Sequence, residues 1–153
     1  ENVRIGAEAA AGMKLSLWRN KASAAKVEGQ NDELLGLTGL APKADRLVGE
    51  LSHGDQRSAE IAMALTLQPR LLLLDEPTAG MGEQETYQIA GLIRRLHRNA
   101  NYTIVLIEHD MRVVFNLADR ICVLDQGKLL ADGTPAEIAA DPHVQAAYLG
   151  KAE

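Results

Sequence analysis

The spacing of hydrophobic residues along this chain changes after residue 50. Residues 1–50 are rich in alanine on both sides of Gly12 and are only loosely patterned, which predicts helices. One helix should cover 31–37 and end in the segment 38–42, because that segment contains a glycine and a proline. From residue 51 onward, short apolar runs alternate with stretches of helical spacing, which indicates a different architecture.

Two continuous apolar runs lie in the second part of the chain, at 71–74 and 103–107. Runs of this kind predict strands that are buried on both faces. Between them, the apolar residues of 89–96 recur as on one face of a helix that starts near Glu83. The other predicted elements are helices at 52–67 and 111–117, strands at 121–124 and 128–131 joined at Gln126-Gly127, and a helix begun by the capping box 134–137.

Strands that alternate with helices predict an α/β fold with a parallel sheet and crossover helices. In such sheets, ligands bind beyond the carboxyl ends of the strands. The residues that follow 74 and 107 are therefore the first place to look for chemistry.

Charged side chains and a histidine follow both predicted strands. Asp75 and Glu76 come directly after the first strand. Adjacent carboxylates at a buried strand end are costly unless they bind a cation or activate a water molecule. Asp75 suits Mg²⁺ held through its water shell, and Glu76 could deprotonate an attacking water. His109 should lie on the same sheet edge as Glu76. Chance acids at a solvated strand end, and a structural histidine, are the alternatives for each cluster alone.

The segment 51–57, with the sequence LSHGDQR, directly precedes a predicted helix. Serine and glycine at a helix start leave backbone N–H groups and a hydroxyl available to an anion. Taken alone, the segment is more typical of a plain helix cap at Ser52 than of an anion site.

Composition narrows the class of protein. The 153-residue chain has 24% charged residues and 46% hydrophobic residues, which is ordinary for a globular domain. Its formal net charge of -5 argues against a nucleic-acid partner, which would require a basic face. The single cysteine, Cys122, excludes an internal disulfide and should be a buried core thiol, because it lies in the apolar run 121–124. No apolar stretch is long enough to span a bilayer.

In combination, three segments resemble the motifs of ABC ATPases, the ATP-binding subunits of ABC transporters. Residues 51–57 resemble the signature motif, residues 71–78 (LLLLDEPT) resemble Walker B, and residues 107–110 (IEHD) resemble the switch histidine. Their order and spacing match the family, and residues 79–82 match the position of the D-loop. The resemblance runs over the whole chain, and it implies a P-loop NTPase-like core with an α-helical signature subdomain.

This resemblance implies a catalytic site at the strand ends. Asp75 would support Mg²⁺ through water, and Glu76 would polarise the hydrolytic water. His109 would contact the γ-phosphate of ATP.

A second site is implied at the signature motif, where Ser52, Gly54, Asp55 and Gln56 would bind the ATP held mainly by an opposite subunit. Ser52 and Gly54 would contact its γ-phosphate. Two positions depart from the family here. His53 stands where glycine is usual, and Asp55 stands where glutamine is common. A carboxylate near a phosphate is unfavourable unless it points away. The D-loop departs as well, because it ends in Gly82 instead of Asp or Asn.

The sequence G-x-x-x-x-G-K-[ST], the phosphate-binding loop of the family, occurs nowhere in the chain. The chain also begins with Glu1 instead of Met. We therefore expect it to be the C-terminal part of an ATP-binding subunit, inactive by itself. Residues 1–55 should form the helical subdomain that ends in the signature motif. Residues 56–153 should form the C-terminal half of the ATPase core, with the second half of a mainly parallel sheet and flanking helices.

The tail of the chain, at 132–138 and 142–150, resembles that of ATP-binding subunits for branched-chain amino acid import or for urea import. The implied partners are a second ATP-binding subunit, identical or different, and transmembrane permease subunits at the cytoplasmic face of the membrane. Two alternatives remain open. One is a degenerate, non-hydrolysing interaction module, and the other is a soluble ABC ATPase of the kind used in DNA repair or translation.

Overall fold

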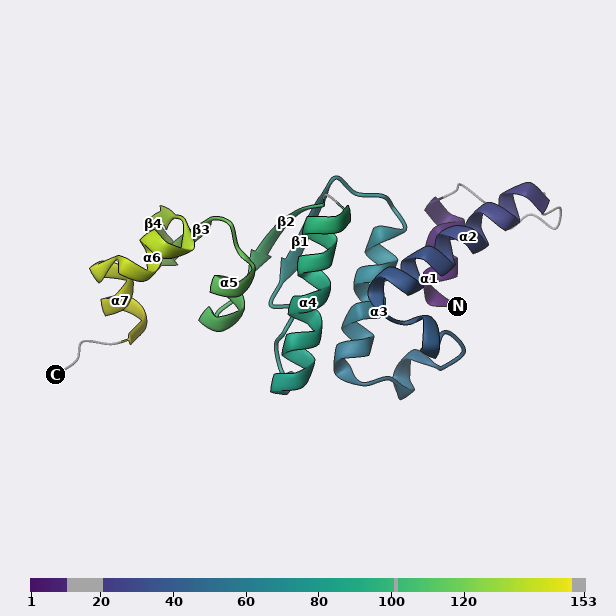
Figure 1. Ribbon diagram of the computed structural model, residues 1–153, viewed down its shortest axis with the longest axis horizontal. Helices are drawn as coiled ribbons and strands as arrows, with labels where there is room; N and C mark the ends of the chain where they lie inside the picture. Colours follow the sequence, from purple (N-terminus) through teal and green to yellow (C-terminus); the bar gives the residue numbers. More distant parts are fainter. Residues whose placement is uncertain (11–20, 101, 150–153) are drawn as a thin grey trace. The chain divides into compact units, whose positions relative to one another are not determined.

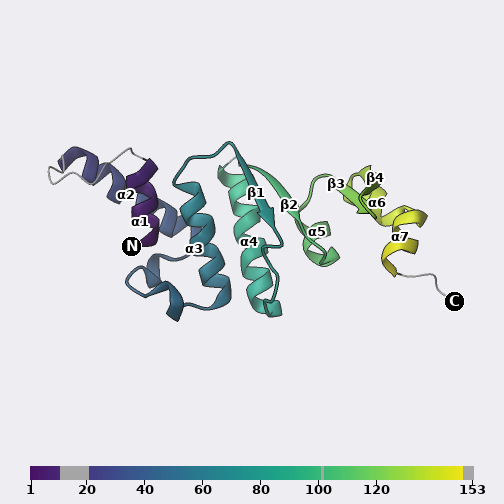
Figure 2. The same ribbon diagram turned by 180° about the vertical axis from the view of Figure 1, so that it is seen from behind.

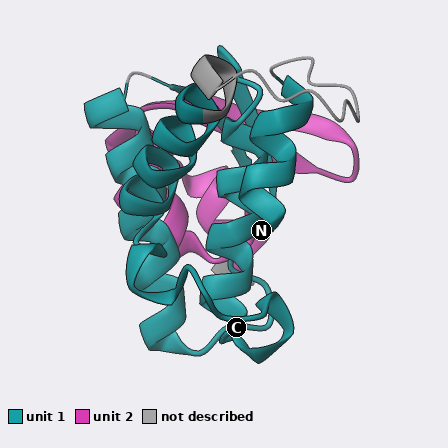
Figure 3. Ribbon diagram, turned by 90° about the vertical axis from the view of Figure 1, so that its right-hand side faces the viewer, with its two compact units in different colours: residues 1–107 teal, residues 108–153 magenta. Residues whose placement is uncertain are grey.

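The computed structural model describes residues 1–10, 21–100 and 102–149. It forms two compact units, residues 1–107 and 108–153, each of which is described by itself (Figure 3). Unit 1 contains α1 (Asn2–Ala10), α2 (Lys21–Thr38), η1 (Ala41–Lys43), η2 (Val48–Glu50), α3 (His53–Leu65), β1 (Leu71–Asp75), α4 (Glu83–Ala100) and β2 (Thr103–Ile107). Unit 2 contains α5 (Met111–Leu117), β3 (Ile121–Asp125), β4 (Lys128–Gly133), α6 (Pro135–Ala140) and α7 (Pro142–Leu149).

The core of unit 1 lies between its helices and one face of its sheet. Figures 1 and 2 both show α4 running alongside β1. The α4 residues that were predicted to share one face are buried, and Leu96 is fully enclosed. The core cluster draws side chains from α1 to α4 and from β1: Val3, Leu34, Ile61, Ala62, Leu65, Leu72, Leu92 and Leu96.

Strands β1 and β2 pair in parallel, which confirms the predicted α/β arrangement. The register places Leu71 opposite Thr103 and Asp75 opposite Ile107, so both strands end at the same edge of the sheet.

Burial on both faces of these strands was predicted, and this prediction is wrong for the chain as described. Leu73 is 68% exposed and Ile107 is 60% exposed. Side chains alternate across a strand, so α3 and α4 cover only the face that carries Leu72. The opposite face of the sheet, called here the open face, carries Leu71, Leu73, Val105 and Ile107.

The N-terminal helices differ from prediction in one boundary. The helix expected at 31–37 begins ten residues earlier, at Lys21. It ends as predicted at Gly39, where φ is +77° and Leu40 donates its N–H to the Leu35 carbonyl, as in a Schellman cap. Gly12 lies outside the described residues. The division predicted near residue 55 follows the resemblance to ABC ATPases and stays a prediction.

Unit 2 confirms the predicted hairpin. Strands β3 and β4 are antiparallel, and Gln126 and Gly127 both have positive φ, as a tight two-residue turn requires. The capping box between Thr134 and Glu137 is present at the start of α6. The prediction for Cys122 is wrong, because its side chain is exposed and its thiol contacts Asp132 at 3.4 Å. It occupies the outward position of a strand whose neighbours Ile121 and Val123 face inward.

Among the residues that the structure describes, no helix combines the length and the apolar character that crossing a bilayer requires.

Candidate functional site: the signature segment and the strand ends

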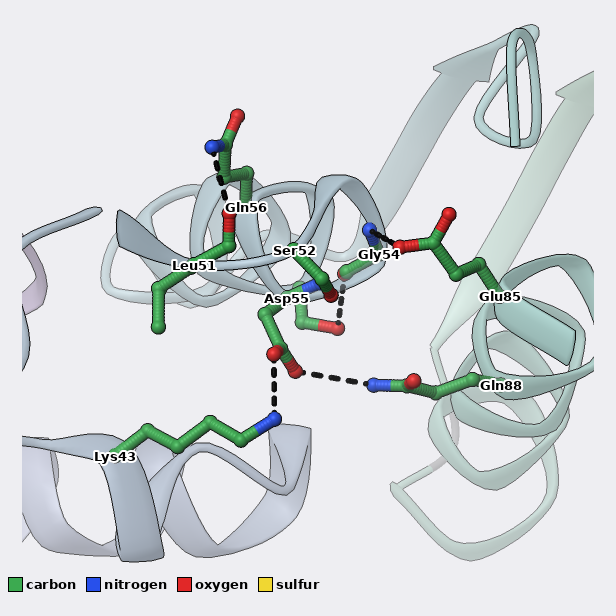
Figure 4. Close-up of polar contacts among 9 residues, drawn as sticks. Lys43, Leu51, Ser52, Gly54, Asp55, Gln56, Glu85 and Gln88 are labelled. Carbon is green, nitrogen blue, oxygen red and sulfur yellow. Dashed lines mark hydrogen bonds and ion pairs between the residues drawn. The ribbon is translucent and has the colours of Figure 1, made fainter. Parts of the chain in front are cut away.

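The signature segment, residues 51–57, forms the first turn of α3 and the residues just before it. Ser52 is the N-cap: its backbone is extended, and its hydroxyl oxygen accepts a hydrogen bond from the N–H of Asp55 at 3.3 Å. This is the role for which serine is favoured at a helix start. The side chain of Gln56 folds back and donates to the carbonyl of Leu51 at 3.0 Å (Figure 4).

Asp55 is the one acidic residue of this segment, and its side chain is only 7% exposed. Its carboxylate forms an ion pair with Lys43 of η1 and accepts a hydrogen bond from Gln88 of α4 at 3.2 Å (Figure 4). Burial favours a higher pKa for Asp55, but the hydrogen bonds from Lys43 and Gln88 outweigh it and hold this pKa below its ordinary value. The carboxylate that departs from the family motif is thus directed to internal partners.

The sequence alone did not identify Lys43 and Gln88 as partners of Asp55. A buried carboxylate needs a compensating partner, but no spacing rule indicates which of the 16 Lys and Arg residues supplies it. Lys43 lies in a connector, and Gln88 lies 33 residues beyond Asp55. Only the packing of η1 and α4 against the start of α3 brings the three together.

Gly54 is a position where α4 comes close to α3. Its N–H donates to the carboxylate of Glu85, in the first turn of α4, at 3.1 Å. A side chain at Gly54 would place its Cβ 3.3 Å from the Cβ of Glu85, which is tighter than an ordinary contact. Glycine therefore permits the close approach of the two helices.

The predicted catalytic carboxylates lie together at the end of β1. Asp75 is its last residue, and Glu76 follows with φ of +41°. The N–H of Glu76 donates to the Ile107 carbonyl at 2.9 Å, which continues the pairing with β2 by one bond. Both carboxylates are exposed, so the burial cost that was expected from the sequence does not arise.

Arg57 of the signature segment contacts the turn that follows β1. Its guanidinium donates to the carbonyl of Pro77 at 3.3 Å and to that of Glu76 at 3.5 Å. The same guanidinium pairs with Glu60 at 2.7 Å, one turn further along α3. The two predicted motifs are therefore in direct contact within unit 1, through a residue to which sequence reasoning gave no role.

His109 lies in unit 2, on the exposed stretch between β2 and α5. Its backbone N–H donates to the Glu108 carboxylate at 3.3 Å. The next residue, Asp110, caps α5 and pairs with Arg112 at 2.9 Å. That arginine, more than any other group, lowers the pKa of Asp110. The expectation that His109 meets Glu76 at a shared site stays a prediction.

Metal binding would have to rely on few protein ligands. Within residues 1–10, 21–100 and 102–149, no three or more His, Cys, Asp or Glu side chains are grouped as a metal cage would require. The exposed oxygens of Asp75 and Glu76 nevertheless suit Mg²⁺, which keeps several waters and commonly uses one or two carboxylates together with substrate phosphates.

Comparison with known proteins identifies the family of the chain. A family model described as ABC transporter matches residues 4–79, and a second, described as branched-chain amino acid ATP-binding cassette transporter, matches residues 128–153. The chain belongs to the ATP-binding proteins of the ABC transporter family.

Its curated relatives include the high-affinity branched-chain amino acid transport ATP-binding proteins LivG of Salmonella typhimurium and BraF of Pseudomonas aeruginosa. The LivG protein is 49% identical over 114 residues, which is 74% of this chain and 45% of the relative. BraF is 48% identical over 113 residues, again 74% of this chain and 44% of the relative. The chain thus spans less than half the length of these relatives.

Solved structures show the same fold. One is cbiO1 from Clostridium perfringens, described as part of the ABC transporter complex cbiONQ. Its TM-score is 0.77 at 26% identity, over 98% of this chain and 57% of that chain. The ADP conformation of MJ1267, described as an ATP-binding cassette of an ABC transporter, has a TM-score of 0.76 at 24% identity. That match covers 98% of this chain and 62% of the other, and at this identity it supports the fold alone.

Proposed function

We propose that this chain forms part of an ATP-hydrolysing subunit that energises an ABC importer of branched-chain amino acids. The proposal rests mainly on one observation: the two ends of the chain match models of related transporter families. The ABC transporter match at 4–79 includes the signature segment and the Walker B strand, and the match at 128–153 is to a branched-chain amino acid model.

In this proposal the signature segment meets the γ-phosphate of an ATP molecule held mainly by an opposite subunit. Ser52 and Gly54 supply a hydroxyl and a backbone N–H at the positive end of α3. Asp55 and Gln56 complete the segment by fixing its shape, since their side chains bond to Lys43 and to Leu51. Neutralisation by Lys43 keeps the charge of Asp55 from opposing the phosphate.

The strand ends carry the proposed chemistry. Glu76 accepts a hydrogen bond from the attacking water and takes up its proton as the water attacks the γ-phosphorus. The bond from the γ-phosphorus to the bridging oxygen breaks, and ADP leaves with the electron pair. The bond between its N–H and the Ile107 carbonyl fixes its backbone relative to β2. His109 contacts the γ-phosphate in this scheme. Asp75 would hold Mg²⁺ through water, and bound Mg²⁺ would supply charge neutralisation at the phosphates.

The proposed partners are a second ATP-binding subunit, identical or different, and transmembrane permease subunits, with the assembly at the cytoplasmic face of the membrane. The relatives LivG and BraF are transport ATP-binding proteins, and cbiO1 is described as part of a transporter complex. The chain alone is expected to bind Mg-ATP only weakly and not to hydrolyse it. Its sequence contains no G-x-x-x-x-G-K-[ST] loop, whose backbone N–H groups and lysine cradle the phosphates.

Reconstituted transport tests the function. The intact subunit that contains this chain is assembled with its permease and substrate receptor in proteoliposomes loaded with ATP. We expect uptake of labelled leucine, and we expect the Ser52→Ala and Glu76→Gln subunits to lose it. Urea and methionine serve as comparison solutes. Uptake of urea in place of leucine would contradict the solute class, and normal uptake by both variants would contradict the site.

A further inference from the structure

Glu85 stands where a phosphate is expected to bind. Its carboxylate accepts the N–H of Gly54 at 3.1 Å, and the nearby hydroxyl of Ser52 helps to lower the pKa of this carboxylate. Figure 4 shows the Glu85 side chain reaching from α4 to the first turn of α3. The Gly54 N–H, one of the two groups that the proposed function directs at the γ-phosphate, is therefore bonded to an internal carboxylate.

The contact is built into the packing of the two helices. Gly54 is buried, and the nearest atoms to a Cβ built on it would be the Cβ of Glu85 at 3.3 Å and its Cγ at 3.5 Å. The stem of Glu85 thus lies against the backbone of Gly54 and aims the carboxylate at its N–H. The backbone of Gly82, the residue before α4, also helps to lower the pKa of Glu85.

We propose that Glu85 is an internal anion that occupies the signature segment in the free subunit and must move before the phosphate of ATP binds there. The inference rests on the proposed function, because it concerns the same Gly54 N–H. One backbone N–H makes one strong hydrogen bond, and two anions at one helix start repel each other. Occupation by Glu85 and occupation by phosphate are therefore mutually exclusive.

The carboxylate keeps its charge at neutral pH. The Gly54 N–H is the main cause that lowers the pKa of Glu85, and the Ser52 hydroxyl and the Gly82 N–H act in the same direction against the opposing effect of burial. An ionised carboxylate is a stronger acceptor than a neutral amide. Glu85→Gln should therefore weaken the internal contact, while glutamine can still cap α4.

If Glu85 occupies the signature segment less of the time, two subunits should associate at a lower ATP concentration. A binding site that is open for only a fraction of the time shows an affinity reduced by that fraction. Releasing the signature segment should therefore lower the ATP concentration needed to bring two subunits together. Asp55 and its partners Lys43 and Gln88 are not part of this exchange, because their bonds involve different atoms.

The experiment measures ATP-driven association of the intact subunit that contains this chain. All variants carry Glu76→Gln, so that ATP persists, and the mass is followed by light scattering during gel filtration at increasing Mg-ATP. We expect Glu85→Gln to lower the ATP concentration for half-association by about fivefold. Glu83→Gln is the matched control: it removes the same charge from the same turn of α4, but its side chain is exposed. Thermal melting of each variant checks that the fold is kept.

The outcomes separate the two proposals. A lower ATP concentration for half-association in Glu85→Gln, without the same change in Glu83→Gln, supports the internal anion. An unchanged or higher requirement for ATP in Glu85→Gln overturns it, while the signature site itself stands if Ser52→Ala abolishes association. If no variant associates with ATP, the proposed function fails, and the inference that rests on it fails too. A shift of equal size in both glutamine variants also overturns it, because it indicates a general effect of charge.

Discussion

The signature segment and the end of β1 both carry carboxylates, but in contrasting surroundings. At the signature segment, Asp55 is enclosed and tied to Lys43 and Gln88. At the strand end, Asp75 and Glu76 are exposed, and the backbone pairing of β1 with β2 fixes the chain there. The acidic side chain of the signature segment therefore stabilises the local structure, whereas the carboxylates at the end of β1 are exposed to solvent. Substitutions in the two regions should accordingly affect different quantities.

The largest expected effect on stability follows from Lys43→Met. It leaves the enclosed Asp55 carboxylate without its cation. Removing one partner of a fully buried pair costs 3–5 kcal/mol, and we expect about 2 kcal/mol here because the Lys43 side chain is 38% exposed. Urea unfolding followed by circular dichroism measures the change. Asp75→Asn is the control, with an expected change below about 0.5 kcal/mol; equal losses in both variants would remove the contrast.

Acid should act on the same group. The pKa of Asp55 in the folded chain lies below its ordinary value of 3.8, so the ionised form stabilises the fold. This contribution is complete above the unfolded pKa and is lost as the pH falls through the lower, folded value. Stability of the wild-type chain should therefore fall below about pH 4, and Asp55→Asn should remove part of that fall. Urea midpoints at pH 3, 4 and 6 test this; identical pH profiles for the two proteins would refute it.

A smaller effect on stability, but a clear one on association, is expected at the open face. Leu71, Leu73, Val105 and Ile107 leave an apolar surface on β1 and β2, and such surfaces drive self-association. Leu73→Lys should shift light-scattering masses toward the 16.5 kDa monomer and change the unfolding free energy by less than about 0.5 kcal/mol. A wild-type chain that is already a monodisperse monomer with a sharp, high-temperature transition would show that the face needs no cover.

The smallest effect is expected in unit 2. Arg120 holds the exposed Asp132 through two hydrogen bonds of 2.7 Å and, with Cys122, lowers its pKa to about 2. Arg120→Gln should return this pKa toward 3.8, as measured by carboxyl carbon NMR. The unfolding free energy should hardly change, because exposed ion pairs contribute little. An unchanged Asp132 titration would show that the pair does not form.

Sequence reasoning predicted the elements whose signals are local. The apolar face of α4, the turn at Gln126-Gly127 and the capping box at Thr134 each depend on residues close together in the chain. Sequence reasoning gave the wrong burial for strand residues, because the burial of a strand depends on which other elements cover its two faces. The runs that contain Leu73 and Cys122 are apolar, but each places alternate side chains on a face that none of the described residues of its unit covers.

The candidate site divides in the same way. Motif order located Ser52 and Glu76, because the spacing of these motifs is a property of the sequence. It could not locate Lys43, Glu85 or Gln88, whose contacts with the signature segment join elements far apart in the chain. The one local signal was Asp55, which stands where glutamine is common in the family motif. An enclosed carboxylate needs a compensating partner, so this residue indicated that such a partner is required.

The central claim is that the exposed carboxylate after β1 performs the hydrolytic chemistry, and its most direct test is steady-state ATP hydrolysis by the intact subunit that contains this chain. Glu76→Gln should reduce turnover to below about a tenth of the wild-type rate, a barrier increase above about 1.4 kcal/mol, with ATP binding largely kept. Asp75→Asn should lose binding and turnover together, because it removes the support for Mg²⁺. A Glu76→Gln subunit that hydrolyses ATP faster than a tenth of the wild-type rate would contradict the account and turn attention to His109.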